Sequence, residues 1–499
     1  MTRIINYSLH KKSLKEGTVI QRFFQTAALT LGMTLSAHAA GTPTDSAKPD
    51  SQAVKKFELR KELMQQYPNV LKTLTSNANA GFGGEQSIAI ANHMYSRTNA
   101  EAIADARAKM TVEPHGKGTW LLRMPYVNIA VFETREGLVL VDAGYAPAGP
   151  ALLETLRKLS NKPVNTIIIT HHHADHGFGA WSLLEAGEKP RIITTQEYLA
   201  EMDLDTRTAN YSIVQLNSQD PRDVPRKLTD AILPTETFTG QKTLKIGDDE
   251  FVLTHARGES ADQLWVNVAT RKIVVSADYW QPFLLNAGNG KRRQRYVAEW
   301  AQALRDMAAT KPDLLLPMHG PALTDAAEVQ DKLLASANML SSAVDQVIAG
   351  LNADKRPDEI VATVQLPEKL RGRKDMAETY VRFKNVASMV LKEYGGWWNG
   401  IPSEWDPAAR ATFSKQMVAM SGGVQKVNDQ IKLLSQSDPA LACQLADIAY
   451  FAEPNNQDVL QTALDAYALR VQPGMPTQEL TVYIQHMLTL KSQLKSVMQ

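Results

Sequence analysis

The fold is decided by residues 166–179, Thr-Ile-Ile-Ile-Thr-His-His-His-Ala-Asp-His-Gly-Phe-Gly, where a β-branched run passes directly into a cluster of metal-ligand side chains. β-Branched residues are stiff at χ1 and favour strands, and the run 167–170 is apolar enough to be buried on both faces of a layered sheet. Loops that follow such strands often carry function. We therefore predict a buried strand that ends at a metal site.

The spacing of the ligands after this strand predicts two neighbouring metal ions. Alternate side chains of an extended backbone share a face, so His171 and His173 can bind one ion. Asp175 and His176 face another way and suit a second ion close by. His172 then points away from both and is not expected to be a ligand. A solvated polar loop without a defined site is the alternative, and four ligand side chains at this spacing argue against it.

The pattern His-x-His-x-Asp-His resembles the signature of the metallo-β-lactamase superfamily. The resemblance implies an α/β fold, the αββα sandwich, with the metals at one end of the two sheets. Most members carry histidine where Glu259 stands, and a glutamate there is typical of the alkyl sulfatase branch. Asp278 departs from that branch, which normally has glutamate at this position. The resemblance implies two sites, one with His171, His173 and Glu259 and one with Asp175, His176 and His319, bridged by Asp278.

These later ligands follow predicted strands, as the first group does. Glu259 lies in a loop between two strands, and Asp278 and His319 each come directly after a short apolar run. Asp142 also follows a buried strand, and in the superfamily an Asp-x-Gly there supports the metal loop from behind. A plain turn aspartate is the alternative for Asp142.

From about residue 326 the pattern is helical nearly to the end. Residues 343–367, 394–402 and 451–456 resemble parts of the alkyl sulfatase dimerisation domain, so the resemblance covers about 115–490 and implies a homodimer. Alternatively, the apolar stripes of these helices form a core and no interface. We expect these domains: a signal peptide over 1–39, a helical and loop extension over 40–110, a catalytic domain over 111–325 and an α-helical dimerisation-like domain over 326–499.

The N-terminus predicts export. Basic residues precede the apolar run 23–35, and Ala37-His38-Ala39-Ala40 has small residues at the spacing of a cleavage site. The run is shorter than the roughly 20 residues that span a bilayer. We expect a periplasmic or secreted protein that begins near Ala40, without a membrane span. The single cysteine, Cys443, cannot form an internal disulfide. The 54 basic and 53 acidic residues nearly cancel, so no nucleic-acid partner is expected.

The resemblance implies a metal-dependent hydrolase that cleaves alkyl sulfate esters with a metal-activated water. Two divalent ions, with zinc as the expected metal, lower the pKa of such a water from 15.7 to about 7 and polarise an anionic substrate. A basic loop, 288–295, stands where the family has its anion-binding arginines. The residues expected to act on the substrate are Asp175, Asn385, Arg292, Arg293 and Arg295.

One departure keeps other functions open. The family normally has a histidine near the sulfate, and Asn385 stands in its place; an amide can donate a hydrogen bond but does not readily give up a proton. Another ester (a lactone, phosphodiester or β-lactam) and a non-catalytic metal-binding dimer are the alternatives. The alkyl tail is expected near Tyr394, Trp397 and Trp398, although these aromatics suit buried packing at a domain joint as well.

Overall fold

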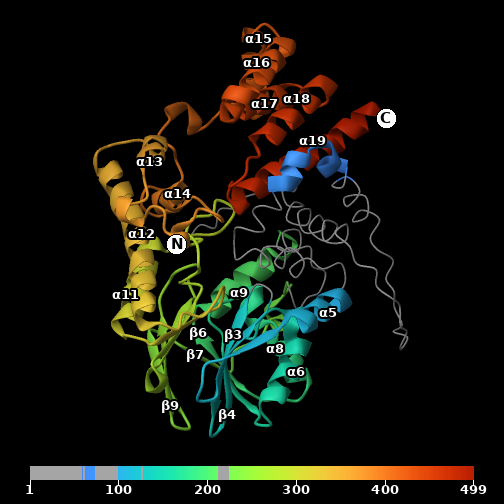
Figure 1. Cartoon of the computed structure of the whole chain (residues 1–499). Coiled ribbons are helices and arrows are strands. Elements are labelled where there is room, and N and C mark those ends of the chain that lie inside the picture. The colour runs from blue at the N-terminus through green and yellow to red at the C-terminus, as the bar shows by residue number, and fades with distance from the viewer. Residues whose placement is uncertain (1–58, 60–61, 74–98, 125–126, 212–223) are drawn as a thin grey trace, which may run out of the picture.

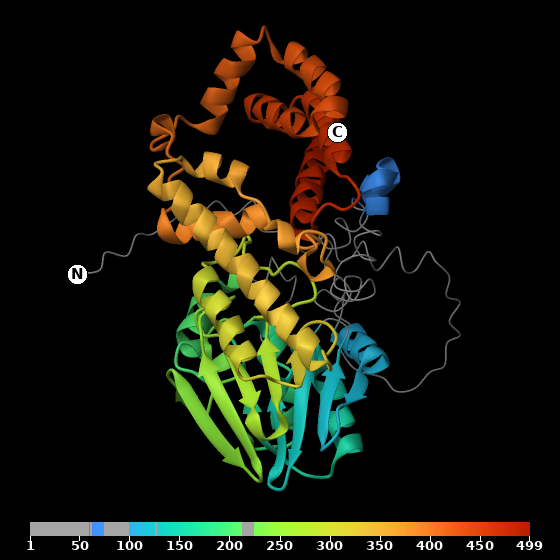
Figure 2. The same cartoon turned by 60° about the vertical axis from the view of Figure 1, so that its left-hand side comes forward.

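The computed structural model describes residues 59, 62–73, 99–124, 127–211 and 224–499, and Figures 1 and 2 show it from two sides. The expected signal peptide lies outside the described residues. Strands gather in one half of the molecule, and the other half is helical (Figure 1). Among the described helices, none combines the length and apolar character needed to cross a bilayer.

The first sheet has seven strands in the order of the chain. The strands from β1 to β4 pair antiparallel, and those from β4 to β7 pair parallel. Its strands are β1 (Thr111–Pro114), β2 (Thr119–Arg123), β3 (Asn128–Thr134), β4 (Gly137–Val141), β5 (Val164–Ile168), β6 (Arg191–Thr195) and β7 (Glu236–Phe238).

The second sheet has five strands in the order β12-β11-β10-β9-β8. All neighbours pair antiparallel except β11 and β12, which are parallel. Its strands are β8 (Gln241–Ile246), β9 (Asp249–His255), β10 (Leu264–Val268), β11 (Ile273–Ala277) and β12 (Leu314–Pro317).

Alternate residues of each central strand face two different cores. Leu121 packs between the two sheets with Phe132 and Phe251, whereas its neighbour Leu122 packs on the outer face with helix residues such as Leu152. Because successive side chains of a strand point to opposite faces, a strand that is apolar throughout must be covered on both sides. The two sheets therefore pack face to face and carry helices outside.

The covering helices complete four layers. On the first sheet lie α5 (Asn99–Lys109), α6 (Gly149–Leu159), α8 (Ala180–Glu185) and α9 (Tyr198–Arg207). The second sheet is covered by α11 (Val297–Ala309) and the first part of α12 (Ala326–Asn352). The predicted αββα sandwich is thus confirmed.

The helical half begins with α12, which runs out of the sandwich (Figure 2). Its 27 residues span about 40 Å, so one helix belongs to both halves of the molecule. The others are α13 (Pro357–Thr363), α14 (Phe383–Tyr394), α15 (Arg410–Met420), α16 (Val424–Ser437), α17 (Pro439–Ala452), α18 (Gln457–Arg470) and α19 (Thr477–Met498). The last five enclose a core of their own, which Leu63, Met64 and Val70 of the N-terminal segment join. This confirms the predicted all-helical C-terminal region.

Arg271 ties the two sheets together at the end opposite the predicted metal loop. Its guanidinium, only 7% exposed, pairs with Asp249 of the second sheet. It also donates to the carbonyl oxygens of Lys117 (2.7 Å) and Glu133 (2.8 Å) beside the first sheet. We expect Arg271→Met to lower the free energy of unfolding by about 3 kcal/mol, because a buried carboxylate loses its partner.

Urea unfolding measures this loss. Arg135→Met is the matched control, since Arg135 pairs with Asp248 nearby but both side chains are more than half exposed, at 79% and 66%. Surface pairs of this kind contribute little. Equal urea midpoints for the two variants would contradict the conclusion that Arg271 holds the two sheets together.

Candidate metal centre

The candidate ligands come from strand ends that meet at one edge of the sandwich. β4 and β5 are parallel neighbours, and Asp142 and the 171–176 loop follow them. β11 and β12 are parallel neighbours in the other sheet, and Asp278 and His319 follow those. Because parallel strands end at the same edge, four chain segments far apart in sequence place their polar residues together.

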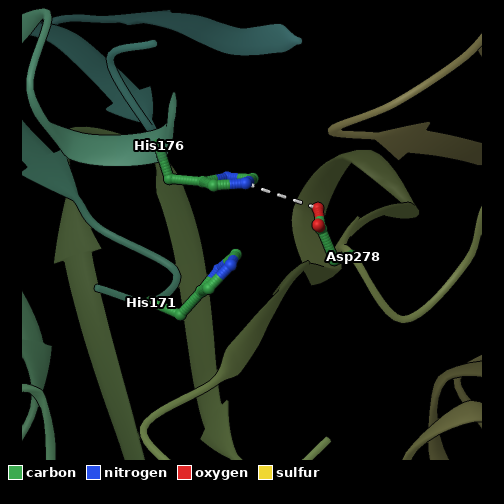
Figure 3. A group of neighbouring side chains, drawn as sticks. All are labelled: His171, His176 and Asp278. Atoms are coloured by element: carbon green, nitrogen blue, oxygen red, sulfur yellow. Dashed lines mark ion pairs between the residues drawn. The ribbon is translucent and has the colours of Figure 1, made fainter. Parts of the chain in front are cut away.

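Two overlapping groups of ligand side chains form at this edge. The ligand atoms of His171, His176 and Asp278 all lie within 4.8 Å of one another, and those of Asp175, His176 and His319 do the same. Figure 3 shows the first group, with His176 and Asp278 pointing toward each other. His176 is common to both groups.

Asp278 extends one oxygen to each of two histidines. Its Oδ1 lies 3.6 Å from His176 Nε2, and its Oδ2 lies 3.2 Å from His319 Nε2. Asp175 Oδ2 lies 3.7 Å from the Nε2 atoms of the same two histidines. Because the same carboxylate also lies within 4.8 Å of His171, which belongs to the other predicted set, its position suits the bridging role that the sequence predicts for Asp278.

His173 and Glu259 lie beside these groups but belong to neither. His173 Nδ1 is 2.9 Å from His171 Nε2 and 3.8 Å from Glu259 Oε1. Glu259 Oε1 also pairs with Arg295 Nη1 at 2.7 Å, because a buried carboxylate takes the nearest cation. His171, His173 and Glu259 therefore lie close together. That they bind one ion jointly stays a prediction.

Unpartnered buried atoms show that these residues fit a metal. His176 Nε2, Asp278 Oδ1 and Glu259 Oε2 are buried without a hydrogen-bond partner. A buried polar atom without a partner is costly, and metal coordination is one way to satisfy it. Imidazole nitrogens together with carboxylate oxygens are the donors that zinc accepts in proteins. The residues present thus fit divalent ions.

The electrostatics of the cluster follow from its carboxylates. Burial lowers the pKa of His176, but Asp175, Asp278 and Asp142 outweigh it and raise the value to about 10. In the same way Asp278 and Asp175 raise the pKa of His319 to about 9 against the effect of burial. The histidines in turn hold the pKa of Asp278 well below its usual range although burial opposes this. The carboxylates therefore favour positive charge at this spot.

Asp142 supports the loop from behind. It adopts a left-handed backbone, φ 62°, and is fully buried. Its carboxylate accepts from Thr170 N (2.8 Å) and Thr170 Oγ1 (2.9 Å) and contacts His176 Nδ1 (2.7 Å). These bonds orient His176 so that its Nε2 faces Asp278. Of the two alternatives that the sequence leaves open for Asp142, they fit the supporting role and not a plain turn residue.

We expect Asp142→Asn to weaken metal binding about 10- to 100-fold, as loss of such supporting partners does elsewhere. An amide nitrogen cannot accept the bonds that one carboxylate oxygen now accepts. Competition with a chelating dye measures the affinity, and thermal unfolding of the metal-free protein separates it from a folding defect. Unchanged affinity would leave Asp142 as a turn residue only.

The three candidate arginines of the basic loop have different surroundings. Arg295 is 1% exposed and donates to Asn286 O (2.6 Å) besides pairing with Glu259. Arg293 Nη2 contacts His172 Nε2 (2.8 Å) and pairs with Glu201 (2.9 Å) and Asp205 (3.1 Å).

Arg292 is exposed. The pKa of His173 lies well below its usual range, chiefly because the side chain is buried. The positive charges of neighbouring histidines, Arg292 and Arg295 lower it further. Arg292 and Arg295 thus act electrostatically on the cluster. Arg293, in contrast, forms ion pairs with carboxylates of α9.

Asn385 lies at the start of α14. Its Oδ1 accepts from Arg382 N at 2.8 Å and caps the helix. The backbone of Gly288 comes so close that a Cβ there would lie 2.1 Å from the Asn385 carbonyl oxygen. The structure therefore brings Asn385 to the beginning of the basic loop, with its amide oxygen already used in the cap.

The aromatic residues expected around the alkyl tail lie elsewhere. Tyr394 ends α14, so about 14 Å of helix separate it from Asn385. The side chain of Trp397 is 72% exposed and that of Trp398 is 37% exposed. They are therefore not buried at the domain joint, and the expected groove has no support in their placement.

Two features of the site were missed by sequence reasoning. His172 Nδ1 contacts the fully buried Asp262 at 2.9 Å, and this links the metal loop to the loop of Glu259. Ala277, just before Asp278, has φ 48°, which only glycine adopts freely. Asp262 follows Glu259 by three residues in a loop between buried strands, which is the one signal that marks it. No local signal marks Ala277.

Known proteins match both halves of the chain. Residues 123–319 match the family model of the metallo-beta-lactamase superfamily, and residues 356–492 match that of alkyl sulfatase dimerisation. A linear primary-alkylsulfatase of a Pseudomonas species is 27% identical over 323 residues, which is 60% of this chain and 61% of the relative. An alkyl/aryl-sulfatase of Saccharomyces cerevisiae is 21% identical over 371 residues, 68% of this chain and 57% of the relative.

A solved structure shares the fold. The stereoselective inverting sec-alkylsulfatase Pisa1 from Pseudomonas sp. superposes with a TM-score of 0.65 at 19% identity, over 79% of this chain and 67% of that one. The chain spans only 55% to 61% of the length of the curated relatives it matches. By its two domains in this order, the chain belongs to the alkyl sulfatase family of the metallo-β-lactamase superfamily.

Proposed function

We propose that this protein is a binuclear metal-dependent hydrolase that cleaves alkyl sulfate esters to an alcohol and sulfate. The observation that carries the proposal is the position of Asp278, whose carboxylate lies within 4.8 Å of His171 of the first predicted set and 3.2 Å from His319 of the second. A carboxylate placed between the two sets suits two ions side by side. The choice of a sulfate ester is supported by the family and by the names of its relatives.

The ligand set accounts for what the cluster has to do. His171, His173 and Glu259 would hold one ion, Asp175, His176 and His319 the other, and Asp278 would touch both. When bound, a pair of divalent cations supplies a water of lowered pKa and positive charge toward an anionic ester. The reaction consumes one water and leaves an alcohol, sulfate and one proton.

Arginine side chains of this chain would orient the sulfate. Arg295 is buried beside Glu259, and Arg292 is near enough to His173 to lower its pKa. A guanidinium presents a planar fork of donors to an oxyanion and keeps its charge. The amide nitrogen of Asn385, whose oxygen caps α14, can still donate a hydrogen bond. Asn385 cannot serve as a general acid, so the leaving group, sulfate after attack at carbon or the alcohol after attack at sulfur, receives no proton from this position.

The alternative functions differ in the contacts that they require from the site. A lactone or β-lactam is uncharged at the scissile group and gains little from buried arginine, whereas a phosphodiester would use it. A non-catalytic metal-binding dimer would need no anion contact at all. The buried position of Arg295 next to a candidate ligand favours an anionic ester.

Export and dimerisation belong to the same proposal. The basic and apolar N-terminal residues support a periplasmic or secreted protein that starts near Ala40. The match to the dimerisation domain supports a homodimer. N-terminal sequencing of the mature protein tests the first point; a chain that still carries residues 1–39 would contradict it.

A substrate panel tests the reaction. Purified protein is supplied with dodecyl sulfate, nitrophenyl sulfate, a nitrophenyl phosphodiester, a lactone and a β-lactam, and each product is measured. We expect sulfate release from the alkyl ester to exceed turnover of the others. Turnover of another ester without sulfate release would replace the proposed substrate, and bound metal without any turnover would favour the non-catalytic reading.

A further inference from the structure

Large apolar side chains are exposed mainly in one part of the helical half. About half of those exposed among the described residues lie between Tyr394 and Phe451. Within this stretch Trp397, Trp398 and Trp405 form a tryptophan cluster: the rings of Trp397 and Trp405 stack with centroids 5.8 Å apart, and Trp398 meets Trp405 edge-on at 5.5 Å. Exposed fractions of 72%, 37% and 62% are unusual for three neighbouring tryptophans.

The loop that carries the cluster is held in place by its own hydrogen bonds. Trp398 Nε1 donates to Ile401 O (3.2 Å), and the Asn399 side chain accepts from Ile401 N (3.0 Å). Gly400 has φ 85° and packs on Arg356 at the start of α13. The rings are therefore presented outward by an ordered loop, and their binding to a partner would require little further ordering.

We infer that the tryptophan cluster is the centre of the contact between two copies of this chain. The inference rests on the proposed homodimer and names its surface. The cluster lies inside residues 356–492, which match the dimerisation family. Tryptophan is the residue most enriched at the energetic centres of interfaces.

Area and charge both favour a second copy as the partner. The exposed parts of the three rings offer on the order of 400 Å², about half of what each partner contributes to a standard interface. A two-fold contact brings the cluster against its own copy, so apolar meets apolar. The charged residues beside it are Glu393, Glu404 and Asp406 against Lys392 and Arg356, so the cluster has no surplus of positive charge to draw it to an anionic membrane or micelle.

The experiment is light scattering of the full chain across a dilution series. We expect a dimer for the unaltered protein, and for Trp405→Glu a dissociation constant raised at least about 30-fold. Leu233→Glu is the matched control, because Leu233 is 45% exposed in the metal-binding half, and it should stay dimeric. Circular dichroism checks folding, and Trp397→Glu takes the place of Trp405→Glu if the latter does not fold.

Each outcome decides the inference. A dimeric Trp405→Glu or Trp397→Glu variant would overturn the surface while leaving the homodimer intact. A monomeric unaltered protein would overturn both, and a blue shift of its tryptophan fluorescence with neutral detergent would then assign the cluster to an amphiphile surface. Sulfate release is measured separately on the unaltered protein, so failure of the proposed reaction is recognised independently.

Discussion

Asp278→Ala is expected to lower turnover more than about 1,000-fold. The carboxylate of Asp278 lies within 4.8 Å of His171 of one predicted set and 3.2 Å from His319 of the other, so one substitution removes the group that joins both ligand sets. Bound metal should fall from about two ions per chain to one or fewer. The fold should persist, because Asp278 follows the end of β11 and lies outside the apolar core between the sheets.

Metal analysis, turnover and thermal unfolding of the same preparation check this expectation. Asp313→Ala is the control: Asp313 precedes β12 at its other end, where it pairs with Lys272 and is 59% exposed. It should keep full activity and metal. Retention of two ions by Asp278→Ala would contradict the bridging role.

Arg295→Met is expected to lower kcat/KM for an alkyl sulfate about 100-fold, since loss of a buried charge contact costs about 3 kcal/mol. The guanidinium is 1% exposed and pairs with Glu259, so its charge is little screened by water. Arg293→Met is the matched control, because Arg293 is 45% exposed and already faces Glu201 and Asp205. The fall in kcat/KM for Arg293→Met should be less than about a tenth of the fall for Arg295→Met.

The substrate charge separates an anion contact from a general disturbance. A neutral nitrophenyl ester should lose much less than the alkyl sulfate when Arg295 is replaced. Equal losses on both esters would mean that Arg295 only positions Glu259, and an unchanged kcat/KM on sulfate would exclude it from substrate binding. Steady-state kinetics of both esters with each variant give these ratios.

Much of the fold follows from periodicity in the sequence. The apolar runs predict β4, β5, β11 and β12, because strands buried on both faces have continuous apolar sequences. The metal strand nevertheless ends at Ile168, two residues earlier than expected. Its neighbour β4 ends at Val141, so Thr170 finds its hydrogen bonds in the Asp142 side chain and not in a strand. β8 was missed because Gln241, Lys242 and Lys245 make this edge strand polar.

Most candidate ligands were predictable because they are ligand-type residues that follow an apolar strand, whereas Glu259, in the loop between two strands, was predicted from the family resemblance. The surroundings of the arginines were not, since only the packing of α9 against the basic loop brings Glu201 and Asp205 to Arg293. Likewise, a Gly-rich turn with two tryptophans reads equally well as buried or exposed, and nothing local decides between them. Contacts between distant segments decide such cases.

The central claim is that this chain uses two divalent ions to hydrolyse a sulfate ester. The most direct measurement counts the metal in protein purified without chelator and follows sulfate release from dodecyl sulfate before chelation, after it and after metal is restored. We predict about two ions per chain, release that stops when they are removed, and recovery when they return. Fewer than two ions with full release, or release that survives chelation, would contradict the account.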